Sequence, residues 1–212
     1  MNLILLGAPG AGKGTQAELL IEQLSIPAIS TGNMLREAMA NGSELGQKVK
    51  KFMEEGSLVP DDVILDIVAE RVAKSDCANG FILDGVPRTL AQAEALQERG
   101  VCIDHVVSIE IDDSVIEGRM TGRRVCGKCG ASYHVVANPP KAEGICDSCG
   151  SQLVIRKDDA PETVRHRLDV YHQQTEVLKD FYAKLGKLRL VEGNQSIEGA
   201  NRDILGAIGA KV

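Results

Sequence analysis

Short apolar runs alternate with longer segments of helical periodicity along most of this 212-residue chain. The apolar runs have the length of buried strands and lie at Asn2–Leu6, Ala28–Ile29, Phe81–Leu83, His105–Ile111 and Leu188–Val191. Helices are predicted where apolar residues recur every three or four positions, at Lys13–Leu24, Thr31–Ala40, Glu44–Glu55, Asp61–Lys74, Thr89–Arg99, Asp113–Thr121, Pro161–Leu185 and Ile197–Ile208. This alternation predicts an α/β fold in which helices wrap a parallel sheet.

The longest predicted helix runs from Pro161 to Leu185, with apolar positions from Val164 to Tyr182 at helical spacing. Pro161 suits a first helical turn, and Asp159 can cap the helix.

Two stretches interrupt the alternation. Residues 30–59 predict two helices without a strand, and residues 122–159 predict short β turns rich in glycine and proline. We interpret both as mobile insertions in a core built from residues 1–29, 60–121 and 160–212.

The sequence GAPGAGKGT, from Gly7 to Thr15, separates the first predicted strand from the first predicted helix. Backbone N–H groups of such a loop converge on phosphate oxygens, and Lys13 adds a positive charge. Glycine lets the backbone approach the phosphates and adopt positive φ. The alternative is an ordinary glycine-rich βα turn, but the flanking strand and helix favour nucleotide binding.

The loop departs from the general P-loop pattern in one respect. Gly14 follows Lys13, so the hydroxyl that usually holds Mg²⁺ comes one residue late, at Thr15. We therefore expect phosphates, water and a distant carboxylate to hold Mg²⁺. Thr15 also replaces the third glycine of a dinucleotide-binding pattern that starts at Gly10, which disfavours that fold.

Cys126-x-x-Cys129 and Cys146-x-x-Cys149 are separated by sixteen residues, a spacing typical of a four-thiolate zinc site. Because four thiolates leave no open coordination position, we expect a structural metal that holds the insertion together. Redox pairs and incidental cysteines are the alternatives. Cys77 and Cys102 lack such partners, and we expect them to be buried small residues.

The length predicts one domain or one domain with insertions, and the composition fits a soluble globular protein. The chain is 43% hydrophobic with a net charge of −6, has no run of the roughly 18 apolar residues that a membrane helix needs, and begins without an export signal. We therefore expect a cytoplasmic protein without membrane partners. Residues 119–167 hold nine basic and five acidic residues, against 15 and 25 elsewhere. A local basic segment in an acidic chain suits a small polyanion better than a nucleic acid.

Five motifs occur in one order along the chain: GAPGAGKGT, STGNMLR (Ser30–Arg36), DGVPRT (Asp84–Thr89), GRR (Gly122–Arg124) and RKDD (Arg156–Asp159). Over essentially its whole length the chain resembles adenylate kinases, specifically the long-lid bacterial type with four lid cysteines. The resemblance implies reversible phosphoryl transfer from ATP to AMP, giving two ADP, with catalytic Mg²⁺ and structural Zn²⁺. It also implies that residues 30–59 form an AMP-binding flap and residues 122–159 an ATP lid.

On the donor side, the resemblance places Lys13 on the β and γ phosphates and stacks Arg119 on the adenine of ATP. Asp84, at the end of a predicted strand, is the carboxylate best placed to order the waters of Mg²⁺. The implied ATP site comprises Gly10, Ala11, Gly12, Lys13, Gly14, Thr15, Arg119 and Arg123.

On the acceptor side, the resemblance implies that Arg36 and Arg88 clamp the AMP phosphate. Arginine suits this role because its planar fork matches phosphate oxygens. The implied AMP site comprises Thr31, Gly32, Arg36, Gly85, Arg88, Gln92, Arg156 and Arg167. The implied catalytic residues are Lys13, Asp84, Arg88, Arg123, Arg156 and Arg167, of which Arg123, Arg156 and Arg167 close on the transferred group.

Several of these residues have a second interpretation. Thr31 could cap the helix that follows it, and Thr89 with Gln92 fits a capping box, although the family has Thr31 and Gln92 contacting adenine. Asp158 and Asp159 could cap a helix, pair with lid arginines, or do both. Arg165 lies two residues before Arg167 and faces elsewhere, so we expect it to be solvated or structural.

Two residues depart from the family pattern: Asn33 stands where Asp is common, and Val86 where Phe is common. His134 would be a fifth metal ligand and is left out of the site. Three other functions compete with the main one: a kinase for another nucleoside monophosphate, a zinc ribbon that binds nucleic acid, and a P-loop ATPase or switch. No direct signal for oligomeric state is present, and we expect a monomer.

Overall fold

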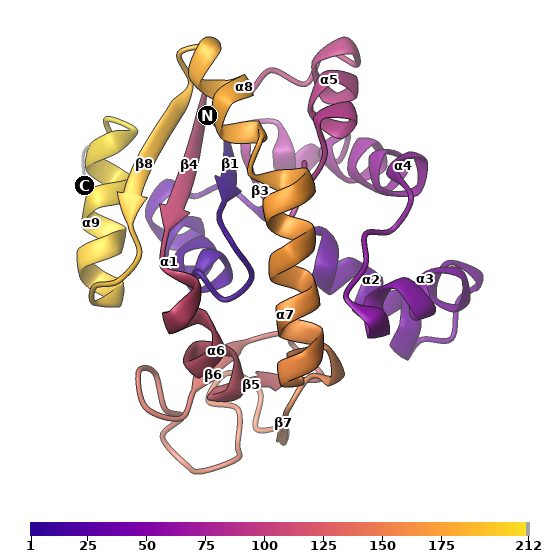
Figure 1. Cartoon of the computed structure of the whole chain (residues 1–212), viewed down its shortest axis with the longest axis vertical. Coiled ribbons are helices and arrows are strands. Elements are labelled where there is room, and N and C mark those ends of the chain that lie inside the picture. The colour runs from indigo at the N-terminus through magenta and orange to yellow at the C-terminus, as the bar shows by residue number, and fades with distance from the viewer. Residues whose placement is uncertain (211–212) are drawn as a thin grey trace.

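A computed structural model describes residues 1–210, and Figure 1 shows a central sheet flanked by helices. The sheet has five parallel strands in the order β2-β3-β1-β4-β8. Their bounds are β1 (Asn2–Leu6), β2 (Ala28–Ser30), β3 (Phe81–Asp84), β4 (His105–Glu110) and β8 (Leu188–Glu192). The predicted parallel sheet is confirmed, and each predicted strand matches an observed one to within one residue at either end.

The helices of the described residues follow the predicted order. They are α1 (Lys13–Leu24), α2 (Thr31–Ala40), α3 (Glu44–Glu55), α4 (Asp61–Val72), α5 (Leu90–Glu98), α6 (Asp113–Thr121), α7 (Pro161–Val170), α8 (Leu178–Lys184) and α9 (Ile197–Ala207), with short 3₁₀ turns at Ser75–Cys77 and Lys157–Asp159. No described helix is long and apolar enough to cross a membrane.

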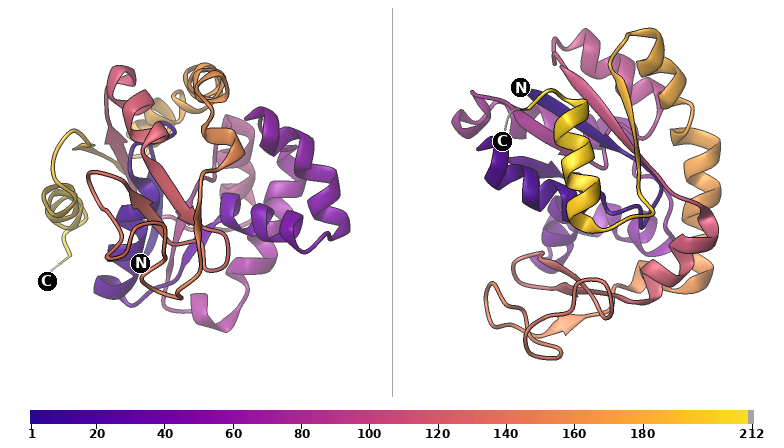
Figure 2. Two further views of the ribbon diagram at one scale, coloured as in Figure 1. Left: turned by 90° about the horizontal axis from the view of Figure 1, so that it is seen from below. Right: turned by 90° about the vertical axis from the view of Figure 1, so that its left-hand side faces the viewer.

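The two faces of the sheet pack against different helices (Figure 2). In β1, Leu3 and Leu5 join a core with α1 and α9, whereas Ile4 and Leu6 join a core with α4, α5 and α8. Successive side chains of a strand point to opposite faces. Full burial of each leucine or isoleucine contributes about 1.5–3 kcal/mol. The doubly covered sheet is therefore a rigid support for the loops at its carboxyl edge.

The predicted helix from Pro161 to Leu185 is not regular throughout. A π-helical turn, Tyr171–Thr175, separates α7 from α8, and the Glu176 N–H donates to the carbonyl of Tyr171, five residues earlier, at 2.9 Å. Pro161 occupies the first turn as predicted. The prediction that Asp159 caps this helix is wrong: the N-cap is Ala160, without a side-chain cap, because the Asp159 carboxylate is bound by arginines.

Residues 30–59 contain α2 and α3, which pack closely where Gly46 meets Ala38. A Cβ at Gly46 would lie 2.2 Å from the carbonyl oxygen of Ala38, so only glycine allows this approach. Helix α2 has Ser30 at its N-cap, so the interpretation of Thr31 as the capping residue is wrong.

Residues 122–159 form a three-stranded antiparallel sheet in the order β6-β5-β7, at the bottom of Figure 1. Its strands are β5 (Arg123–Cys126), β6 (Ser132–His134) and β7 (Leu153–Val154). Its buried core cluster consists of Cys126, Tyr133 and Cys146, with Ala131, Cys149 and Leu153 packed against it. We call residues 122–159 the lid segment.

The lid segment and the α2–α3 segment touch each other. Lys157 pairs with Glu54 at 3.1 Å, and the Arg156 guanidinium donates to the Asn33 side-chain oxygen at 3.4 Å. Segments far apart in the sequence therefore meet above the carboxyl edge of the central sheet.

Of the two cysteines outside the lid segment, Cys77 is buried as predicted and accepts a hydrogen bond from the Arg71 guanidinium at 3.0 Å. Cys102 is exposed, so its predicted burial is wrong. It lies in the loop that precedes β4, where its carbonyl, and not its thiol, accepts a hydrogen bond from Asn2.

Candidate functional site

A cavity of about 610 Å³ lies between the carboxyl edge of the central sheet, the α2–α3 segment and the lid segment. The loop from β1 to α1 forms one wall. Gly12, the N-cap of α1, has φ 101° and ψ 9°, a left-handed conformation that favours glycine. This wall therefore consists of a glycine-rich loop followed by the N-terminus of α1, an arrangement that binds anions through backbone N–H groups.

Lys13 is the first residue of α1 and lines this cavity. Its ammonium donates to the loop carbonyls of Gly7 at 2.6 Å and Ala8 at 2.9 Å. Burial lowers its pKa to about 8; nearby Asp84 opposes this shift and the cavity arginines add to it. A neighbouring anion, such as a phosphate group, would therefore stabilise the charged form of Lys13.

Six arginines from separate elements line the same cavity. They come from α2, the β3–α5 loop, α6, β5, the end of the lid segment and α7: Arg36, Arg88, Arg119, Arg123, Arg156 and Arg167. This positive surface exists within a chain of net charge −6. Such a site attracts a compact, highly charged anion.

Crowding of these cations shows in their pKa values. Burial, together with neighbouring Arg36 and Arg123, lowers the pKa of Arg156 to about 9. Burial lowers the pKa of Arg167 to about 10, against the opposing effect of Asp158. Burial also lowers the pKa of Arg36 and of Arg88. Desolvation penalises all four cations and like charge adds to the penalty for Arg36, Arg156 and Arg167; bound phosphate groups would relieve both penalties.

Asp158 and Asp159 provide part of the missing negative charge. The Asp159 side chain is fully buried and pairs with Arg123 through both carboxylate oxygens. Arg167 donates to Asp158 at 2.8 Å and to Asp159 at 3.4 Å. The predicted pairing with a lid arginine is confirmed for Asp159, whereas the ion-pair partner of Asp158 is Arg167 of α7.

Most residues of the predicted sites meet at this cavity, but two do not line it. The Thr31 hydroxyl donates to the carbonyl of Gly85 at 3.1 Å. Gln92 is 2% exposed; its amide donates to Asp61 at 2.6 Å and its oxygen accepts from the Arg88 N–H at 2.7 Å. Thr89 caps α5 by accepting from the Gln92 N–H. The capping interpretation of Thr89 is therefore confirmed. The Gln92 side chain, however, accepts from the N–H of Arg88 and not from that of Thr89, as a capping box would require.

The cavity also contains residues that the sequence analysis did not single out. They lie mainly at the end of β8 and start of α9, in β6 and the turn after it, and in α3: Gly193, Gln195, Ser196, Ile197, Glu198, Ala200, Ser132, Tyr133, Ala137, Asn138 and Met53. Only the position of 193–200 after a parallel strand could have indicated them, because ligands gather at carboxyl ends of such strands.

Arg165, which the sequence places outside the site, is exposed and pairs with Glu117 at 3.0 Å. It does not line the cavity. Its predicted solvated or structural character is confirmed.

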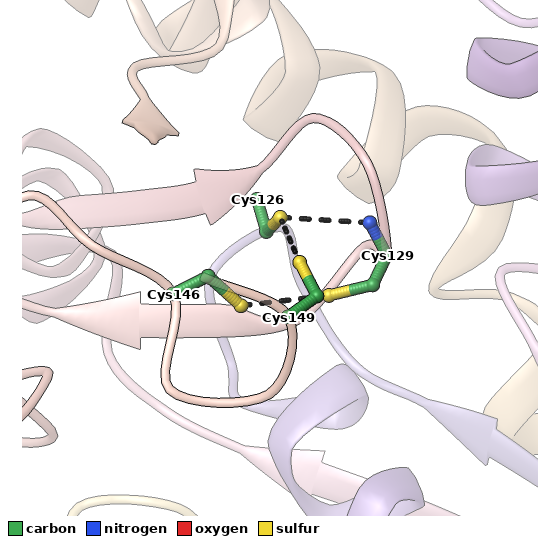
Figure 3. A group of neighbouring side chains, drawn as sticks. All are labelled: Cys126, Cys129, Cys146 and Cys149. Atoms are coloured by element: carbon green, nitrogen blue, oxygen red, sulfur yellow. Dashed lines mark hydrogen bonds between the residues drawn. The ribbon is translucent and has the colours of Figure 1, made fainter. Parts of the chain in front are cut away.

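The four lid cysteines converge at one point, as Figure 3 shows. Their sulfurs all lie within 4.8 Å of one another, with Cys126 and Cys149 3.4 Å apart and Cys129 and Cys146 3.5 Å apart. Tetrahedral thiolates around Zn²⁺ lie roughly 3.8 Å apart, so this donor set fits a metal. His134 instead accepts two backbone N–H bonds through Nδ1, consistent with its exclusion from the ligands.

Comparison with known proteins gives a consistent result. The family model for adenylate kinase matches residues 5–187. The chain is 54% identical over 213 residues to an adenylate kinase of Caldicellulosiruptor bescii, with 99% of each chain covered. It is 53% identical to one of Caldicellulosiruptor saccharolyticus, with both chains covered in full, and 54% identical to one of Oceanobacillus iheyensis, covering 96% of this chain and 97% of that one. The chain therefore belongs to the adenylate kinase family.

Proposed function

We propose that the cavity described above performs the reaction of this family, with each wall binding one nucleotide. Adenylate kinases transfer a phosphoryl group reversibly between ATP and AMP, giving two ADP, and this is the activity of the chain. The following assignment of residues to steps is our proposal.

ATP binds along the wall formed by the glycine loop. Gly10, Ala11, Gly12, Gly14 and Thr15 present backbone N–H groups to its phosphates, and Lys13 leaves the loop carbonyls for the β and γ phosphates. The Arg119 guanidinium, held by the carbonyl of Gly193 at 2.8 Å, stacks on the base. Residues 193–200 then line the pocket around that base.

AMP binds on the opposite side, between the α2–α3 segment and the β3–α5 loop. Arg36 and Arg88 clamp its phosphate, while Gly32 and Gly85 allow close approach. Thr31 and Gln92 are proposed to contact the adenine. For Gln92 this requires an exchange of partners, because its amide is held by Asp61 and Arg88.

Transfer itself needs alignment and charge neutralisation more than covalent chemistry, because its transition state is loose and highly anionic. Arg123, Arg156 and Arg167 converge from the lid segment and α7 and stabilise that charge. Asp84 lines the cavity and would hold the water shell of Mg²⁺. Bound Mg²⁺ supplies neutralisation of phosphate charge.

We propose that residues 30–59 act as the AMP flap and residues 122–159 as the ATP lid, both closing on a core of residues 1–29, 60–121 and 160–212. The contacts of Lys157 with Glu54 and of Arg156 with Asn33 support such a closure. Closure excludes water, which would otherwise accept the phosphoryl group.

The metal of the four-cysteine site is proposed to be zinc, in a structural role. All four positions of a tetrahedral site are taken by Cys126, Cys129, Cys146 and Cys149, which leaves none for substrate. We further propose a monomer in the cytoplasm whose partners are ATP, AMP and ADP, without nucleic acid or membrane.

The convergence of six arginines and Lys13 on one cavity carries this proposal. The test supplies ADP and Mg²⁺ alone and follows products by phosphorus NMR, where we expect equal ATP and AMP without free phosphate. Arg88→Ala should lower kcat by roughly a thousandfold or more. Arg165→Ala, an exposed arginine outside the cavity, is the matched control and should leave the rate unchanged. Near-normal turnover of Arg88→Ala would contradict the clamp assignment, and free phosphate would contradict water exclusion.

A further inference from the structure

Arg88 is held at three atoms. Its guanidinium Nε donates to the carbonyl of Gly85 at 2.8 Å, and its backbone N–H donates to Gln92 at 2.7 Å. Both partners lie within four residues of Arg88. The third bond comes from a distant element: the Thr175 hydroxyl donates to the Arg88 carbonyl at 2.8 Å, across 87 residues of sequence.

Thr175 is placed for this contact by the π-helical turn. The side chain is 8% exposed and, with Tyr171, faces a small cavity of about 70 Å³ that Lys13, Arg88 and Arg167 also line. A threonine in a helix commonly donates to the carbonyl four residues earlier. Here that carbonyl, of Tyr171, accepts the Glu176 N–H, and the hydroxyl leaves the helix for Arg88. π turns occur often at functional sites.

Arg88 needs such a restraint more than Arg123 and Arg167 do. Arg123 and Arg167 form ion pairs with Asp158 and Asp159, whereas within residues 1–210 no carboxylate lies within ion-pair distance of Arg88. The Arg88 guanidinium shares its cavity with Lys13 and Arg167, whose like charges repel it, and with Asp84 and Asp158, which attract it without forming an ion pair. Backbone hydrogen bonds are therefore the main restraint on its position.

We propose that Thr175 is a positioning residue for Arg88: its hydroxyl fixes the carbonyl of Arg88 and so aims the guanidinium at the phosphate acceptor. This proposal rests on the role of Arg88 proposed above. Thr175 does not line the 610 Å³ cavity proposed to bind the nucleotides. It acts from α7 and the π turn on the β3–α5 loop, and so couples the helix that follows the lid segment to the acceptor clamp.

The test compares Thr175→Val, which keeps the shape but loses the hydroxyl, with Thr175→Ser, which keeps the hydroxyl. Misplacing a reacting group by an ångström costs about a hundredfold in rate, so Thr175→Val should lower kcat roughly ten- to hundredfold with little change in KM for ATP. Thr175→Ser should restore most of the rate. Thermal unfolding followed by circular dichroism shows that each variant is folded, and Thr175→Ala replaces Thr175→Val if that protein does not fold.

A double-mutant cycle separates positioning from a purely structural effect. In an Arg88→Ala background, Thr175→Val should change kcat by less than about twofold, because the residue through which it acts is gone. A full loss of rate in both backgrounds would overturn the proposal, as would a wild-type rate for Thr175→Val. Normal turnover of Arg88→Ala alone would instead overturn the role of Arg88, which distinguishes the two failures.

Discussion

Replacing Asp159 by asparagine should lower the melting temperature of the protein and increase the amount by which bound ATP raises it. The Asp159 side chain has no exposed surface and is shared by Arg123 and Arg167, whose side chains are 18% and 16% exposed. Removing one partner of a buried ion pair costs about 3–5 kcal/mol, because a charge is left without compensation. Partial exposure of both arginines places the expected cost at the lower end, about 3 kcal/mol.

For a chain of this size, 1 kcal/mol shifts the melting temperature by about 2–4 °C, so the variant should melt about 6–12 °C below the wild type. ATP should reduce this difference in melting temperature. Its phosphates replace the lost carboxylate beside both arginines, so ATP binds more tightly to the variant and stabilises it more.

The assay is thermal unfolding by circular dichroism, with and without saturating ATP and in the absence of AMP. Asp169→Asn is the matched control, since Asp169 is an exposed carboxylate on α7, the helix that follows Asp159 in the chain. It should shift stability by less than about 0.5 kcal/mol. If the difference in melting temperature between wild type and variant stays equal or widens with ATP, Asp159 does not occupy the place of a phosphate charge. A loss of unfolding free energy below about 1 kcal/mol without ATP would refute the expected cost of breaking the buried ion pair.

Three further outcomes follow from the structure. Because the pKa of Lys13 is lowered to about 8, Lys13 loses its proton above that pH in the free enzyme; kcat/KM for ATP should fall there, and calorimetry in buffers of different ionisation enthalpy should show proton uptake on ATP binding. Hydrogen bonds to Glu176 and Asp113 raise the pKa of His172 in the folded protein. The contribution of protonated His172 to the free energy of unfolding is therefore complete below pH about 6.5, the unfolded-state pKa, and is lost as the pH rises through the folded-state pKa. Urea unfolding should therefore separate the wild type from His172→Gln at pH 5.5 and not at pH 9. Metal removal with a thiol-directed mercurial should raise KM for ATP and abolish the cooperative unfolding of the lid segment while the central sheet keeps its circular dichroism; native mass spectrometry should find one metal per chain before treatment, and none there would remove the site.

The fold was largely predictable because its elements have strong local signals. Glycines and caps mark the ends of helices α1, α2 and α3, whose predicted bounds match the structure. The π turn carries no such signal: Leu168, Tyr171, Thr175 and Leu178 keep helical spacing across it, so periodicity alone predicts an unbroken helix. The π turn is recognised by the backbone hydrogen bond from Glu176 to a carbonyl five residues earlier, which depends on backbone geometry and not on side-chain type.

The candidate site divides along the same line. The glycine loop and the cysteine spacing predict their own clusters, because their chemistry is written in short motifs. The amide partners of Gln92 lie four and 31 residues away, and the hydroxyl on Arg88 lies 87 residues away. Long-range hydrogen bonds of this kind depend on how elements pack, so no pattern in one sequence could indicate them.

The lid segment has only a small apolar interior, a cluster of Cys126, Tyr133 and Cys146, and the metal proposed for its four cysteines would hold it together. The central sheet owes its cohesion to two large apolar cores instead. With the proposed metal, the stability of the central sheet and that of the lid segment are thus set by different chemistry in different parts of the chain. Selection for a warmer or colder habitat can alter one with little effect on the other. Turnover would then depend on the supply of metal in the cell under conditions where the stability of the central sheet does not.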